Sequence, residues 1–121
     1  MISSTGRINI TQYDDYLVAN GRQFTWTSST GAWNGGDLGT GTIRAEFKHR
    51  RAGTVLSRTG AIVSSTAPQS VRLEMPSTFT GQFEPGQIYY YQIRCQTIGD
   101  RLETLETGEL IVNDSILGGA T

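Results

Sequence analysis

Apolar and polar side chains alternate without a break in Thr42-Ile43-Arg44-Ala45-Glu46-Phe47-Lys48-His49. Successive side chains of a β-strand point to opposite sides, so the alternation predicts a strand with one buried face and one solvated face. The buried face holds Ile43, Ala45 and Phe47. A strand of this kind is typical of an antiparallel sheet that covers a core on one side only.

Similar patterns recur on both sides of this stretch, separated by turns that contain glycine or proline. The pattern predicts further strands over residues 7–11, 22–28, 54–57, 61–64, 70–75, 88–97 and 101–113, and a single helical turn over 77–83. An irregularity is expected near Gly108. The spacing favours an all-β fold, an immunoglobulin-like antiparallel β-sandwich of seven to eight strands with extended terminal arms. A small barrel is the alternative.

The length of 121 residues is that of one domain, so a single domain over 1–121 is expected. Residues 1–20 are interpreted as an entering segment whose first part, to about Arg7, is an arm, and residues 114–121 as a C-terminal arm. A glycine-rich connection spans 29–41, where Trp33 and Leu38 are expected to pack on the core. No apolar run is long enough to cross a membrane, and the first residues lack the apolar centre of a signal peptide.

The residue types that carry most protein chemistry are scarce. One cysteine and one histidine exclude an internal disulfide and the common zinc sites within one chain. Asp14 and Asp15 lack the further carboxylates that calcium needs. Cys95 lies on the inward face of a predicted strand, and nothing around His49 resembles a nucleophile, base and orienting acid. We therefore expect no enzyme activity, no cofactor and no metal.

The remaining candidates are surface groups for protein contacts. Lys48-His49-Arg50-Arg51 is interpreted as a basic turn, either merely solvated or facing an acidic protein surface. The formal net charge of -1 argues against nucleic-acid binding. Alternation points Tyr90 outward, while Tyr89 and Tyr91 point to the core. The candidate protein-interaction residues are Trp33, Lys48, Arg50, Arg51, Tyr90, Ile116 and Leu117.

Charge is divided unevenly along the chain. Residues 1–72 carry eight basic and four acidic groups, a balance of +4, and residues 73–121 carry two basic and seven acidic groups, a balance of -5. Opposite patches of this kind favour contacts between copies, unless the charges intermix in the folded domain.

Four motifs carry a resemblance to a known family. They are Gly36-Asp37-Leu38 with Gly41-Thr42 before the strand at 43–48, Val71-Arg72-Leu73 before Pro76-Ser77-Thr78, the segment 86–93 with its Tyr89-Tyr90-Tyr91 run, and the segment 104–112 around Gly108. Over about residues 22–113 the chain resembles the immunoglobulin-like amino-terminal domain of tailed-phage baseplate upper proteins. Those proteins continue into a long helix and a receptor-binding region, which these 121 residues do not include.

The resemblance implies a non-enzymatic structural protein located in the virion and assembled in the host cytoplasm. We expect a capsid decoration or cement protein that binds and stabilises the shell in many copies. The expected partners are the major capsid protein or other virion proteins, and further copies of the chain; neither membrane nor nucleic acid is expected. The alternatives are a tail or baseplate adaptor, and a recognition module for a glycan or host surface.

Overall fold

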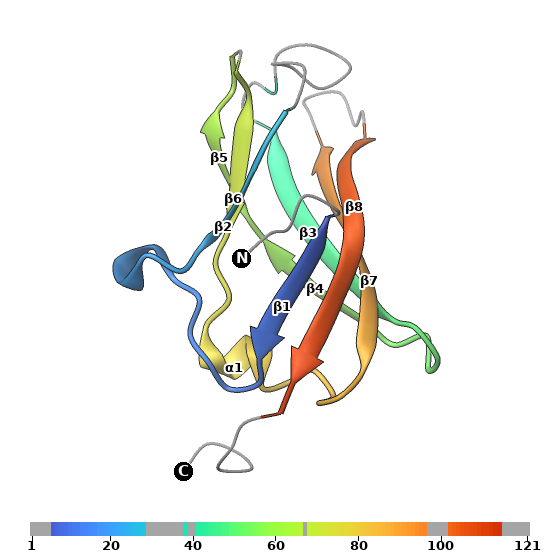
Figure 1. Cartoon of the computed structure of the whole chain (residues 1–121). Helices are drawn as coiled ribbons and strands as arrows, with labels where there is room; N and C mark the ends of the chain where they lie inside the picture. The colour runs from blue at the N-terminus through green and yellow to red at the C-terminus, as the bar shows by residue number, and fades with distance from the viewer. Residues whose placement is uncertain (1–5, 29–37, 39–40, 67, 97–101, 115–121) are drawn as a thin grey trace.

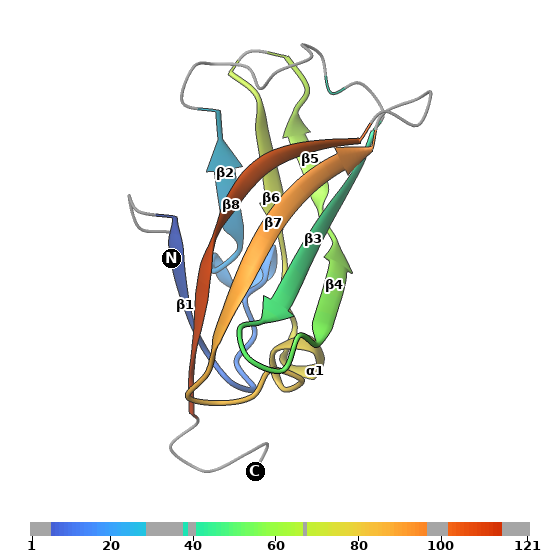
Figure 2. The ribbon, with the colours of Figure 1, turned by 90° about the vertical axis from the view of Figure 1, so that its right-hand side faces the viewer.

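Two β-sheets pack face to face in the computed structural model of the chain (Figure 1). The structure describes residues 6–28, 38, 41–66, 68–96 and 102–114. Figure 2 looks onto the larger sheet, with the smaller sheet behind it. In chain order the elements are β1 (Arg7–Thr11), the 3-10 turn η1 (Val18–Asn20), β2 (Phe24–Thr27), β3 (Thr42–His49), β4 (Val55–Thr59), β5 (Ala61–Ser64), β6 (Ser70–Leu73), the helical turn α1 (Ser77–Thr80), β7 (Ile88–Gln96) and β8 (Leu102–Asn113).

The strand order is that of an immunoglobulin-like sandwich. The larger sheet runs β1-β8-β7-β3-β4 and the smaller one β2-β6-β5. In immunoglobulin terms β2, β5 and β6 take the places of strands B, D and E, and β3, β7 and β8 those of C, F and G, with β4 beside β3 like strand C′. The predicted sandwich is confirmed, and two separate sheets rule out the barrel alternative.

One strand pair departs from the antiparallel pattern. β1 runs parallel to β8, from the pair Arg7 and Glu109 to the pair Thr11 and Asn113, whereas the other pairings between the named strands are antiparallel. The chain joins the larger sheet from Arg7 onward, so β1 matches the predicted strand over residues 7–11.

Aromatic rings fill the space between the sheets. The ring of Phe47 on β3 lies with its centroid 5.3 Å from that of Phe83, 6.0 Å from Phe79 and 6.2 Å from Tyr91. Helical turn α1 supplies Phe79 and lies at one end of the sandwich, the lower end in Figure 1. Alternation along the predicted strands at 42–49, 70–75 and 88–97 points one set of side chains toward the core, and all of them are buried: Ile43, Ala45, Phe47, Val71, Leu73, Met75, Tyr89, Tyr91, Ile93 and Cys95. Leu38 of the glycine-rich connection is buried as well.

The chain passes from one sheet to the other at Gly60, between β4 and β5. The Gly60 N–H donates to the carbonyl of Ile43 on β3 over 2.9 Å. A Cβ at this position would lie only 2.6 Å from the Arg72 carbonyl oxygen on β6. Glycine therefore lets one continuous segment serve as the edge of both sheets.

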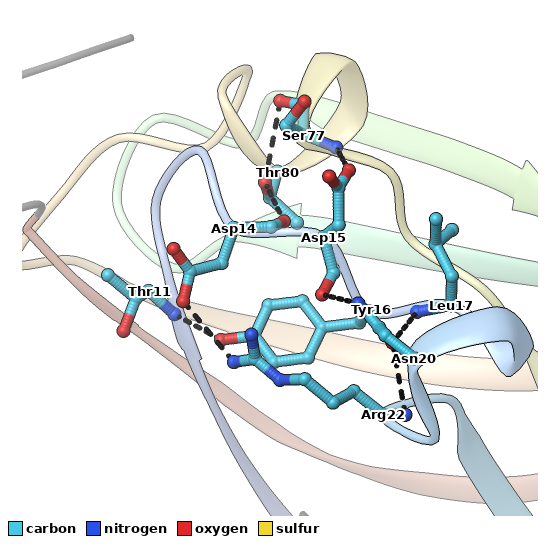
Figure 3. A network of polar contacts seen from close by, with 9 residues as sticks. All are labelled: Thr11, Asp14, Asp15, Tyr16, Leu17, Asn20, Arg22, Ser77 and Thr80. Atoms are coloured by element: carbon cyan, nitrogen blue, oxygen red, sulfur yellow. Dashed lines mark hydrogen bonds and ion pairs between the residues drawn. The ribbon is translucent and has the colours of Figure 1, made fainter. Parts of the chain in front are cut away.

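The entering segment is tied to α1 through the paired aspartates (Figure 3). Asp15 Oδ1 accepts a hydrogen bond from the Ser77 backbone N–H over 2.6 Å, and Thr80 Oγ1 donates to the Asp14 carbonyl over 2.8 Å. Both contacts join residues more than sixty positions apart in the chain. These aspartates therefore hold the N-terminal segment against the end of the sandwich.

Tyr16 and Arg22 complete the same network. The Tyr16 hydroxyl accepts the Thr11 N–H over 2.7 Å, and the Arg22 guanidinium lies over the Tyr16 ring, 4.4 Å from its centroid (Figure 3). Arg22 Nη2 also contacts Asp14 Oδ2 at 3.2 Å. A buried tyrosine is thus fixed at its hydroxyl and over its ring.

The predicted irregularity of the last strand lies at a different residue. Ile93 pairs with Glu106 and Arg94 with Thr104, so Leu105 is the extra residue of a β-bulge. The bulge turns Leu105 into the core, where it is 7% exposed. Gly108, where the irregularity was expected, pairs regularly with Tyr91. The bulge follows the need to bury an apolar side chain rather than the position of a glycine.

Candidate interaction face

The larger sheet has a side that no described element covers. This outer face is the side turned away from β2, β6 and β5, and it faces the viewer in Figure 2. Along each strand, the residues that alternate with the buried ones point their side chains to this outer face. Because these side chains stand on five hydrogen-bonded strands, their relative positions are set by the register of the sheet.

Five residues form a straight line across the outer face, which we call the central row. Lys48 on β3 pairs with Val55 on β4 and with Tyr90 on β7; Tyr90 pairs in turn with Glu109 on β8, and Glu109 with Arg7 on β1. Directly opposed residues of antiparallel neighbours have Cβ atoms about 5 Å apart. The side chains of the central row are therefore neighbours although their positions in the chain span more than a hundred residues.

The central row places an aromatic ring between opposite charges. Tyr90 is 48% exposed, with Lys48 on the neighbouring strand to one side and Glu109 on the neighbouring strand to the other. Glu109 Oε1 lies 3.3 Å from Arg7 Nη2. Val55, 53% exposed, adds an apolar end to the row. The row thus combines an exposed aromatic ring, an exposed valine and charges of both signs. Such groups suit a surface that contacts another protein.

A hollow of about 560 Å³ lies beside Tyr90 on this face. Gln92 and Glu46 line it together with four residues of the central row, Val55, Lys48, Tyr90 and Glu109. Gln92 Nε2 donates to Glu46 Oε1 over 2.9 Å. Glu46 is also 3.6 Å from Arg94 Nη1. The carboxylate beside the hollow therefore has two partners in place, and the wall of the hollow is ordered by contacts within the sheet.

The structure brings together part of the predicted interaction set. Lys48 and Tyr90 lie directly opposite each other on the outer face, and Arg50 and Arg51 are exposed in the turn between β3 and β4. The Arg50 N–H donates to the Ile88 carbonyl over 3.0 Å, which holds this turn beside β7. Trp33, Ile116 and Leu117 lie outside the described residues.

His49 was interpreted as part of the solvated basic turn, and this interpretation is wrong. Its side chain is 6% exposed, and Nδ1 accepts the backbone N–H groups of Arg51 and Ala52 over 3.1 and 3.0 Å. Nε2 lies 3.1 Å from Glu84 Oε2. With Nδ1 an acceptor, the neutral ring carries its proton on Nε2 and donates it to Glu84. The buried His49 side chain thus stabilises the turn in which Arg50 and Arg51 are exposed.

Among the described residues, two buried groups have a shifted pKa, and both stay protonated at neutral pH. Burial raises the pKa of the Cys95 thiol, and the negative charge of Glu103 adds to the shift. Burial also raises the pKa of the Tyr91 phenol. A nucleophilic cysteine needs a lowered pKa, which is the opposite shift.

In the described part of the chain, no three His, Cys, Asp or Glu side chains are placed to hold a metal ion. Among the described helices, none has the length and apolar character needed to cross a membrane.

Val55 and Glu109 belong to the outer face but were not among the predicted interaction residues. Alternation gives the side on which a residue points, and it places Glu46 and Gln92 outward as well. It does not give the register between strands, which decides that Glu109 and Lys48 flank the same tyrosine.

Comparison with known proteins finds no family model that matches the chain and no curated protein that matches it significantly.

Proposed function

We propose that this chain is a non-enzymatic structural protein of a tailed-phage virion, a capsid decoration or cement protein that binds in many copies. The observation that supports it best is the outer face: an uncovered sheet on which Tyr90 stands between Lys48 and Glu109 beside a hollow. Aromatic residues ringed by charged groups are the usual anchors of protein contacts.

The geometry suits a protein whose work is to hold a surface in position. The anchor Tyr90 stands on the nine-residue strand β7, which is paired on both sides by β3 and β8. Little conformational freedom is lost when so rigid a surface binds, and many weak contacts in parallel give strong attachment. The virion assignment itself comes from the resemblance of segments 86–93 and 104–112 to baseplate upper domains.

Immunogold labelling of purified phage particles tests the proposal. Gold over the head is the expected result. Gold confined to the tail would transfer the role to a tail or baseplate adaptor. Particles without label, in preparations where the chain is detected in the lysate, would refute the virion assignment.

A pair of matched valine variants tests the role of the outer face. Val55 on β4 and Val63 on β5 are both 53% exposed, but they belong to different sheets. The Val55→Lys substitution is expected to lower occupancy on particles, and Val63→Lys is expected to leave it unchanged. Equal occupancy for both variants would show that the outer face is not the attachment surface.

The hollow also supports one second candidate, a glycan-recognition module. An aromatic ring beside carboxylate and amide groups, here Tyr90 with Glu46 and Gln92, can stack on a sugar and bond its hydroxyls. A glycan array with the wild type and Tyr90→Ala separates the two functions. Binding that disappears in Tyr90→Ala, with an unchanged thermal melt, would favour the glycan module; no bound glycan would reject it.

A further inference from the structure

We infer that the outer face binds the outer face of a second copy of this chain, around a two-fold axis that runs parallel to the strands beside Tyr90. The observation that carries the inference is the order of charges in the central row. Lys48 lies on one side of Tyr90 and Glu109 on the other. The inference rests on the proposed function and names a second copy of the chain as the partner of its contact surface, but its test needs no virion.

The charge order selects this axis. When two sheets face each other around an axis parallel to their strands, left and right are exchanged between the copies. Lys48 then faces Glu109 of the second copy, and Glu109 faces Lys48 of the second copy. An axis across the strands would instead place Lys48 against Lys48. A closed two-fold contact repeats each favourable pair twice.

The same operation places compatible groups next to the axis, and at the two ends of the central row it sets Arg7 against Val55 of the second copy. Tyr90 lies at the axis, so each ring enters the space beside the other, where each copy has its hollow. Ile88 and Ile111 form the next pair of residues on this face and are half-buried, which extends the apolar centre. In the neighbouring row Glu46 faces Thr107 of the second copy, so no like charges meet there.

The geometry also limits the strength of the contact. Arg94 faces its own equivalent four residues further along β7, about 13 Å from Tyr90. Packed sheets are rotated by about 30° relative to each other, so the contact stays centred on Tyr90 and is lost toward Arg94. We therefore expect a weak, salt-sensitive dimer rather than an obligate one.

Sedimentation velocity of the purified chain over a range of concentrations, at low and at high salt, tests the inference. A monomer–dimer equilibrium that weakens with salt is expected. Lys48→Glu alone and Glu109→Lys alone should each raise the dissociation constant by roughly tenfold or more, because each opposes like charges twice. Arg72→Glu, an equal charge reversal on β6 of the smaller sheet, should leave it unchanged.

Mixing the two variants gives the most specific result. In a heterodimer of the Lys48→Glu and Glu109→Lys chains, both cross-copy pairs again have opposite signs. The mixture should therefore dimerise more tightly than either variant does alone. Dimers that survive both reversals, or a mixture that stays monomeric while the wild type dimerises, would overturn the proposed axis.

A cysteine variant keeps the inference testable if a charge reversal unfolds the chain. Tyr90→Cys places a thiol at the axis and should give a disulfide-linked dimer under mild oxidation, while Val63→Cys should not. No cross-link and no dimer at millimolar chain concentration would reject the inference. If the chain is monomeric but is found on particles, the dimer is rejected and the proposed function stands. If the chain dimerises but is absent from particles, the dimer stands and the proposed function is rejected.

Discussion

The indole Nε1 of Trp26 donates a hydrogen bond to the phenolic oxygen of Tyr91 over 3.4 Å, and their ring centroids are 5.9 Å apart. The same phenol donates to the carbonyl of Gly6 over 2.8 Å. One buried hydroxyl therefore ties β2 of the smaller sheet to β7 of the larger sheet and to the residue before β1. In antibody domains a disulfide links the corresponding strands B and F.

Removing this hydroxyl should destabilise the sandwich. Tyr91→Phe leaves the Trp26 N–H without its acceptor and removes one of two donors to the Gly6 carbonyl, which keeps the Glu109 N–H. The substitution is expected to lower the free energy of unfolding by about 1–3 kcal/mol. Denaturant unfolding followed by tryptophan fluorescence measures the change. Tyr90→Phe, one residue away on the outer face, should stay within about 0.5 kcal/mol of the wild type. Equal effects of the two substitutions would contradict the assigned link.

Gly108 makes room for the same junction. A Cβ on this residue would overlap the carbonyl oxygen of Gly6 and lie 2.6 Å from the Tyr91 hydroxyl. Gly108→Ala must therefore push β1 away from β8, and it is expected to cost about 2–3 kcal/mol of unfolding free energy.

Gly53→Ala is the matched control for Gly108→Ala. Gly53 has a φ of 77°, and a Cβ added there would meet no atom within 4 Å beyond its chain neighbours, so only backbone strain of about 1 kcal/mol is expected. Chemical denaturation of both variants makes the comparison. A Gly108→Ala protein as stable as Gly53→Ala would show that β1 is not packed as described.

Alternation sufficed to predict which residues fill the sandwich, because the side of a strand on which a residue points depends only on its position along that strand. Every predicted inward residue of β3, β6 and β7 is buried. The parallel pairing of β1 with β8 was not predictable in this way, because it joins residues about a hundred positions apart and leaves the pattern of β1 unchanged. The register between strands is likewise not given by alternation. Lys48 and Tyr90 were therefore each predicted as surface residues, but their place in one row with Glu109 was not predicted.

His49 shows a different limit. It continues the inward series of Phe47 on β3, but its neighbours Lys48 and Arg50 suggested a solvated turn. The polar partners that make its burial possible are two backbone N–H groups of its own turn and one carboxylate, Glu84, thirty-five residues away. Neither kind of partner is visible in the residue types around His49.

Because His49 stabilises the turn between β3 and β4, its substitutions should lower the free energy of unfolding to different extents. His49→Ala deprives the N–H groups of Arg51 and Ala52 of their acceptor and is expected to cost about 2 kcal/mol. His49→Asn, whose side-chain oxygen can replace Nδ1, should recover part of that loss. Arg50→Ala should change stability by less than about 0.5 kcal/mol. Thermal and denaturant unfolding rank the three variants.

The ring nitrogens of His49 supply an independent check. Nitrogen-15 NMR at neutral pH should show the neutral tautomer with its proton on Nε2. A proton on Nδ1 would contradict the two backbone hydrogen bonds to that atom, whatever the stability of the variants.

Alkaline pH should weaken the fold through two buried acids. Burial raises the pKa of Cys95 above 9.0 and that of Tyr91 above 10.0; the charges of Glu103 and Glu106 act in the same direction, and the hydrogen bond from Trp26 opposes the shift of Tyr91. Between each ordinary value and the raised one, the unfolded chain has lost a proton that the folded chain still holds. Unfolding then releases protons, so stability falls as pH rises, by up to about 1.4 kcal/mol per pH unit for each group.

Unfolding curves at pH 8, 9, 10 and 11 measure this loss, and two variants divide it between the groups. Cys95→Ala lowers stability at every pH because it leaves a cavity, but it should flatten the decline that begins near pH 9. Tyr91→Phe should leave that part unchanged and flatten the decline above pH 10. If Cys95→Ala kept the full wild-type slope between pH 9 and 10, ionisation of the buried thiol would not be its cause, and the other alkaline groups of the chain would have to account for it.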